Sequence, residues 1–181
     1  MVGLNKLLGV GKRFRSQFKL IDGREFFGQM LDIPDTSRVS NFLSARRYLR
    51  TAPNTFLVPG NVMIAHDTTY IIAEHGEGFS VDPIYKHFKL FGVDQILTWY
   101  GSTVQENAVT GVKEVFTDQD NGVVYLSTQP KASMVDHLHI PQEQHVAICD
   151  RQVLVDDRVG DFVVVKSDMV LGVYVLELKK R

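Results

Sequence analysis

Two segments that begin with glycine and follow the same pattern constrain the fold more than any other feature of this sequence. One covers residues 60–72 (GNVMIAHDTTYII) and the other covers residues 160–176 (GDFVVVKSDMVLGVYVL). Each reads as a turn, an apolar strand, a polar reversal and a second strand that opens on a tyrosine. We expect the reversals at residues 67–69 and 167–168. Units of this kind build small antiparallel β-barrels and sandwiches.

The same β-type composition continues over most of the chain. Short runs rich in Val, Ile, Tyr, Phe and Thr recur between turn residues from Thr55 onward. The predicted strands cover residues 55–58, 61–65, 69–74, 85–91, 95–104, 112–117, 122–128, 145–149, 152–155, 159–166 and 170–178. The tripeptide Asp120-Asn121-Gly122 predicts a hairpin, because Asn-Gly accepts the positive φ angles of a type I′ turn.

One helix is predicted, at about residues 36–51. Asp35, Thr36 and Ser37 offer N-caps, and Pro53 would end the helix. The apolar residues at near-helical spacing are Val39, Phe42, Leu43 and Leu49. The sequence therefore predicts a mainly β protein, an antiparallel β-barrel or sandwich. It would have a basic N-terminal arm (1–13) and one β-rich domain (14–181), with the helix inserted at 36–51 and a long loop at 129–144.

The charge of the chain is unevenly distributed. The net charge is −1, but residues 1–50 hold ten Lys or Arg and four Asp or Glu, a difference of +6, which leaves −7 for the other 131 residues. Opposite poles allow copies of one molecule to dock head to tail. The basic side chains could also contact DNA phosphates, or simply face solvent. The candidate DNA or subunit contacts are Lys12, Arg13, Arg15, Arg38, Arg46, Arg47 and Arg50.

Other global features exclude several classes of protein. Cys149 is the single cysteine, so no intramolecular disulfide can form, which favours a reducing compartment or assembly within a cell. The longest apolar run, residues 169–176, is too short to span a bilayer. Residues 1–11 have no sustained apolar core and do not predict a signal peptide. No membrane partner is expected.

Histidines near the predicted long loop suggest an alternative. His137, His139 and Glu143 have the spacing H-x-H-x3-E, part of a cupin metal motif, and His145 could add a fourth ligand. The glycines that bracket that motif are absent, and Pro141 would interrupt the strand. A metal-dependent, cupin-like β-barrel enzyme is therefore an alternative, whereas the main expectation is a polar loop with surface histidines and no metal or cofactor.

No other residue pattern predicts catalysis. The neighbours His66-Asp67 and Glu74-His75 lack an accompanying nucleophile, and adjacent residues of a strand point to opposite faces. Cys149 lies in an apolar run and is expected to be a core thiol. Asp156, Asp157 and Asp161 lack the remaining ligands of a calcium loop and suit a tight turn. Trp99 is expected in the core, with exposure in a β-rich binding module as the alternative.

The two similar segments also resemble parts of head–tail joining proteins of tailed bacteriophages. Those head-completion and connector proteins often have a turn with Gly followed by Asp or Asn, an apolar strand, and a strand that opens on Tyr followed by Ile or Val. The matching pieces are residues 60–64 with 70–72 and residues 160–164 with 174–176.

The resemblance implies a structural role and no enzymatic activity. Such proteins form rings between the capsid portal and the tail, and DNA passes through the ring. The expected partners are therefore copies of the chain itself and other virion proteins, such as the portal, an adaptor or the tail. Non-specific contact with DNA would accompany them. The expected location is the virion, assembled in the host cytoplasm.

Overall fold

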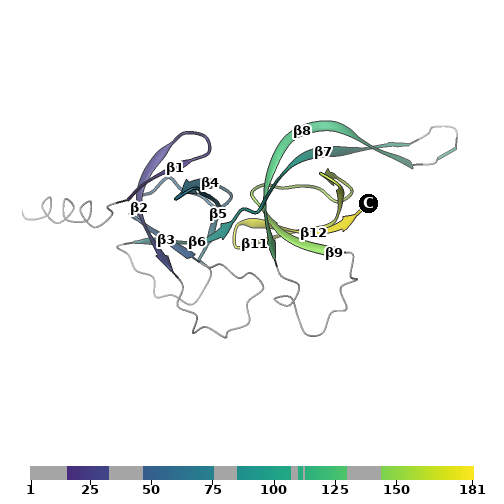
Figure 1. The fold of residues 1–181 in the computed structure, drawn as a ribbon. Coiled ribbons are helices and arrows are strands. Elements are labelled where there is room, and N and C mark those ends of the chain that lie inside the picture. Colours follow the sequence, from purple (N-terminus) through teal and green to yellow (C-terminus); the bar gives the residue numbers. More distant parts are fainter. Residues whose placement is uncertain (1–15, 33–46, 76–84, 107–109, 112, 130–143) are drawn as a thin grey trace, which may run out of the picture.

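The computed structural model describes residues 16–32, 47–75, 85–106, 110–111, 113–129 and 144–181. In this part of the chain, twelve antiparallel strands form two closed barrels (Figure 1). The predicted antiparallel β-barrel architecture is confirmed. The division of the strands between two barrels is a feature that the sequence pattern did not reveal.

Barrel 1 contains the first six strands, which are β1 (Ser16–Leu20), β2 (Glu25–Asp32), β3 (Arg47–Thr51), β4 (Val62–Ala65), β5 (Thr68–Glu74) and β6 (Lys86–Gly92). They pair in the order β1-β2-β3-β6-β5-β4, and β4 pairs with β1 to close the barrel. Barrel 2 contains β7 (Gln95–Glu106), β8 (Lys113–Gln129), β9 (Gln144–Cys149), β10 (Arg158–Val159), β11 (Phe162–Val170) and β12 (Val173–Lys180). Their order is β7-β8-β9-β12-β11-β10, closed by the pairing of β10 with β7.

Both barrels therefore have one topology. Counted from its own first strand, each follows the order 1-2-3-6-5-4. The two similar sequence segments do not lie at equivalent places in this repeat. Residues 60–72 contain β4 and most of β5, the fourth and fifth strands of barrel 1, whereas residues 160–176 contain β11 and part of β12, the fifth and sixth strands of barrel 2. The repeat of the barrel topology therefore does not coincide with the repeat of the two glycine-led sequence segments.

The reversals in these hairpins follow from backbone conformation. In the β4–β5 turn, His66 and Asp67 have φ angles of 47° and 61°, close to the predicted position. The predicted reversal at residues 167–168 is wrong. Ser167 and Asp168 lie within β11, and the turn falls at Leu171 and Gly172, with φ angles of 53° and 73°. Two successive positive φ angles are typical of the type I′ turn of tight hairpins.

The hairpin predicted at Asn121-Gly122 is also wrong. Strand β8 continues through this dipeptide, and Trp99 of β7 faces both residues, which makes a β-bulge. Gly122 has a φ of 93°, and its N–H donates to Oδ1 of Asp120 at 2.8 Å. A bulge with glycine in the left-handed region needs the same positive φ as a turn, so the dipeptide alone does not distinguish them.

The helix predicted at 36–51 is wrong over its last five residues, which form β3. Leu49 and Thr51 are buried in barrel 1, so burial alternates as in a strand. Residues 36–46 and the predicted arm 1–13 lie outside the described residues. So does most of the loop predicted at 129–144, although Gln129 and Gln144 end β8 and begin β9. In the described ranges, no helix is long and apolar enough to cross a membrane.

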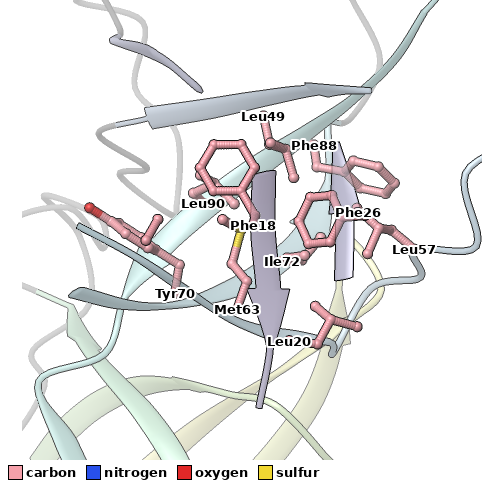
Figure 2. Packing of buried hydrophobic residues seen from close by; sticks show 11 residues of the cluster. Phe18, Leu20, Phe26, Leu49, Leu57, Met63, Tyr70, Ile72, Phe88 and Leu90 are labelled. Carbon is pink, nitrogen blue, oxygen red and sulfur yellow. The ribbon is translucent and has the colours of Figure 1, made fainter. Parts of the chain in front are cut away.

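Alternating side chains fill each barrel. In barrel 1, all six strands contribute to a cluster that includes Phe18, Leu20, Leu49, Met63 and Phe88 (Figure 2). Barrel 2 has its own cluster of buried residues: Val124, Leu126, Ala147, Cys149, Val153, Val159, Val164, Leu176 and Leu178. Burying one such large apolar side chain stabilises a fold by about 1.5–3 kcal/mol. Each barrel therefore has a hydrophobic core of its own.

A third apolar cluster joins the barrels, and we call it the junction cluster. Barrel 1 contributes Val62, Ile71, Ala73 and Phe91, and barrel 2 contributes Val146, Ile148, Val173 and Val175. The connection from β6 to β7 is only Val93 and Asp94. Val93 donates its N–H to O of Thr69, and Asp94 donates its N–H to O of Leu126. The connection is therefore hydrogen-bonded to both barrels.

Two glycines let the barrels approach closely. A Cβ on Gly60 would lie 2.7 Å from the carbonyl oxygen of Asp150 in barrel 2. A Cβ on Gly172 would lie 2.6 Å from Cβ of Pro59 in barrel 1. Both glycines have positive φ angles. Each barrel thus presents a glycine to the other at a place where a side chain would push them apart.

We predict that Gly172→Ala destabilises the protein by at least about 1 kcal/mol more than Gly23→Ala. Gly23 is the matched control, because its φ is also positive but its Cβ would meet nothing within 4 Å. Both variants add backbone strain, and only Gly172→Ala adds a clash at the junction. Urea unfolding measures both free energies. Equal losses would show that the junction tolerates the extra methyl group.

Candidate functional site

Cationic and aromatic side chains gather on the outer side of β3 and β6. Because Leu49 and Thr51 of β3 are buried in the barrel, the alternating residues Tyr48 and Arg50 face outward. The same alternation in β6 turns His87 and Lys89 outward. The pairing register places Arg50 opposite His87 and Tyr48 opposite Lys89. We use the term β3–β6 face for Tyr48, Arg50, His75, Tyr85, His87 and Lys89.

Arg50 is held between two rings of this face. Its Nε donates to Nε2 of His87 at 3.0 Å, and its Cζ lies 4.8 Å from the centroid of the Tyr85 ring. The first contact requires an unprotonated Nε2 on His87, and the second is a cation–π contact. In the described part of the chain, Arg50 forms no ion pair with a carboxylate. Two ring contacts therefore hold the guanidinium in place, and no described carboxylate pairs with it.

The rings of the β3–β6 face are in contact with one another. Tyr48 and His75 stack with centroids 4.7 Å apart, and the His75 and His87 rings meet edge to face at 6.0 Å. The Tyr85 and His87 rings lie 6.4 Å apart. The aromatic groups therefore form one continuous surface around Arg50.

Lys89 adds a second cation. It is half-buried, and burial lowers the pKa of its amine, because desolvation disfavours the charged form. Its ammonium group takes part in none of the ion pairs between described residues. An anionic ligand on this face would supply the opposite charge that Lys89 lacks.

The structure separates the basic residues that the sequence grouped together. Arg47 lies on the same strand as Arg50, but it pairs with Oδ1 of Asp32 at 3.1 Å and donates to the Tyr70 hydroxyl at 2.9 Å. Arg47 is thus already neutralised by a carboxylate. Only Arg50 lies on the β3–β6 face. The other candidates lie outside the described residues: Lys12, Arg13, Arg15, Arg38 and Arg46.

The residues of the metal alternative are mostly outside the described part as well. His137, His139 and Glu143 belong to the range 130–143. His145 is exposed on β9, and its ring packs edge to face against Phe162 with centroids 5.4 Å apart. Among the described residues, no group of three or more His, Cys, Asp or Glu could hold a metal ion. The one described member of the motif therefore makes an aromatic contact.

A buried carboxylate organises one side of barrel 2. Asp157 is 1% exposed. Its Oδ2 accepts from Nε1 of Trp99 at 2.8 Å and from N of Leu154 at 3.1 Å. Its Oδ1 accepts from N and Oγ of Ser102 at 2.7 and 2.8 Å. The sequence assigned Asp157 to a tight turn, and the structure adds a role as the acceptor that fastens β7 to the loop before β10. Trp99 packs against the core, as expected.

Strands β7 and β8 continue beyond barrel 2 as a two-stranded ribbon (Figure 1). Strand β10 pairs with β7 only at Trp99 and Tyr100, and β9 pairs with β8 only from Leu126 to Gln129. Residues 101–106 and 113–119 therefore pair only with each other among the described strands. We call these residues the β7–β8 ribbon. Apart from the N–H of Ser102, which donates to Asp157, the outer backbone groups of both strands have no partner strand in the described part of the chain.

Searches against family models, curated proteins and solved structures found no match. The functional proposals therefore rest on the geometry of the chain and on the resemblance of its two glycine-led segments.

We predict that Asp157→Asn lowers the free energy of unfolding by about 2–3 kcal/mol. The amide would place an NH2 group against N–H donors that now share a carboxylate. Asp156→Asn, at the exposed neighbouring position, is the matched control and should change stability by less than about 0.5 kcal/mol. Urea unfolding followed by the fluorescence of Trp99, the single tryptophan, measures both. Equal effects would contradict a specific role for Asp157.

We predict that Cys149 is unreactive in the folded protein. Burial raises the pKa of its thiol from 9.0 to about 12, so the thiolate forms only in unfolded chains near pH 9. Stability should therefore fall as pH rises from about 9 to 12, and this loss should be smaller in Cys149→Ala. A chromogenic disulfide reagent at about pH 8 should label only denatured protein. Rapid labelling of native protein would contradict the prediction.

Proposed function

We propose that this chain is a structural virion protein of a tailed phage. It forms a ring that joins head to tail around DNA. The observation that carries the proposal is the β7–β8 ribbon. Every strand of the two barrels has a partner on both sides, but the outer part of β7 and β8 pairs only with itself in the described structure.

An exposed ribbon is suited to binding another chain. Unpaired backbone N–H and C=O groups along a strand edge are a template for pairing with a further strand. A two-stranded ribbon alone is marginally stable in water, and contact with a neighbour would order it. A second copy of this chain offers the same edges. We therefore assign the ribbon to the contact between subunits.

The charges of the two halves of the chain support assembly head to tail. Residues 1–92 hold twelve Lys or Arg and eight Asp or Glu, a net charge of +4. Residues 93–181 hold eight Lys or Arg and thirteen Asp or Glu, a net charge of −5. The described residues of the first half hold six Lys or Arg and five Asp or Glu, so most of its positive excess belongs to residues outside the described part of the chain. Opposite poles favour a repeated heterologous contact, which closes into a ring if the rotation permits.

The assignment to a tailed phage rests on this geometry and on the resemblance of the glycine-led segments to head–tail joining proteins. Those segments build hairpins in both barrels, and the short, hydrogen-bonded connection makes the pair a stiff building block. The proposed partners are further copies, the portal or an adaptor, and the tail. The proposed role assigns no reaction and no cofactor to the chain.

We predict that the purified chain forms rings visible by native mass spectrometry and negative-stain microscopy, alone or with portal and tail proteins. A shortened variant tests the ribbon. Replacing residues 104–115 by Asn-Gly joins the register partners Thr103 and Phe116 through a two-residue turn. The variant should keep the circular dichroism spectrum of the barrels and stay monomeric.

Two results would contradict the proposal. A full chain that remains monomeric at high concentration in the presence of portal and tail proteins would exclude a ring component. A shortened variant that still forms rings would remove the ribbon from the subunit contact.

A further inference from the structure

We propose that the β3–β6 face binds the phosphate backbone of nucleic acid without reading its sequence. The inference goes beyond ring assembly. It assigns nucleic-acid contact to named residues of barrel 1, and it stands whether or not the chain forms a ring.

Arg50 is held in position by contacts that do not neutralise it. Contacts with the Tyr85 ring and with Nε2 of His87 hold its guanidinium in position, so binding would cost little side-chain entropy. Neither contact neutralises the charge. A guanidinium presents paired N–H groups that match the oxygens of a phosphate. Arg50 is therefore prepared for an anion that is absent from the described contacts.

Lys89 lies close to Arg50 on the neighbouring strand. Arg50 lies opposite His87 in the register of β3 and β6, and Lys89 is two residues further along β6. Such diagonal neighbours on adjacent strands lie roughly 7–8 Å apart. The two cations can therefore contact neighbouring phosphates of one strand. Binding would also give the half-buried amine an opposite charge, which no described residue supplies.

The aromatic rings of this face favour nucleic acid over an acidic protein surface as the ligand. Four rings in mutual contact share this face with the two cations: Tyr48, His75, Tyr85 and His87. Alternation of aromatic rings with cations is typical of surfaces that bind single strands, on which bases stack and phosphates pair. Binding of an acidic protein surface would require only the two cations and would not require the rings. The ion pairs between described residues elsewhere on the chain involve Arg24, Arg47, Arg151 and Lys166, none of which belongs to this face.

The test measures binding of the full chain to fluorescent oligonucleotides by anisotropy over a range of salt concentrations. The variants are Arg50→Gln and Lys89→Gln. The matched control is Lys19→Gln, an exposed cation on β1, which lies three strands from β6 in the closed barrel. Each of the three substitutions removes one positive charge. Circular dichroism confirms that each variant is folded.

We expect each face variant to weaken binding several-fold and to lower the slope of log K against log salt by about one. The control should leave the slope unchanged. Single-stranded and duplex DNA of equal length are compared. Tighter binding of the single strand would assign base stacking to the rings, and equal binding would assign the contact to phosphates alone; both support the proposal.

Three outcomes would overturn it. The first is no binding of either nucleic acid at low salt. The second is an equal loss in Lys19→Gln, which would show an effect of net charge and no specific face. The third is competition by poly-glutamate as effective as competition by DNA of equal charge, which would identify an acidic protein surface as the ligand.

Discussion

The junction cluster between the barrels is the contact on which the rest of the molecule depends. Strand β5 shows why: residues 70–73 are all buried, because alternate side chains enter barrel 1 and the junction. Residues 146–149 of β9 are buried in the same way. A strand covered on both faces reads as a continuous apolar run. The junction thus covers the outer face of β5 and β9 and takes single positions of β4 and β6 and two of β12.

The β3–β6 face begins where the junction ends. On the outer side of β6, Phe91 belongs to the junction cluster, and Lys89 and His87 follow at the next alternate positions. The apolar end of this row is therefore covered by barrel 2, while its cationic end faces outward. The junction and the β3–β6 face therefore occupy successive positions of one outward row of β6.

The local sequence pattern predicted a mainly β fold but did not predict which strands pair with each other. Val- and Ile-rich runs identified most strands, since alternation needs only neighbouring residues. Barrel closure joins β1 to β4 and β3 to β6, and no local signal specifies such distant pairs. The polar residues 167–168 suggested a turn, but they belong to the mostly solvent-facing part of β11. In residues 47–51, Leu49 suits a helix or a strand, and only its burial within barrel 1 decides between them.

The candidate site was only partly predictable for the same reason. Arg50 was singled out by its charge, but His75, Tyr85 and Lys89 come to the same face only because β6 pairs with both β3 and β5. The two proposals also constrain each other. If charge alone joined the copies, the acidic half of one copy would lie against the basic half of the next, which contains the β3–β6 face, and would compete with nucleic acid. A ribbon that supplies the subunit contact from barrel 2 leaves that face open. A ring that also touches DNA therefore requires the ribbon, and not the opposite poles, to provide most of the binding energy between subunits.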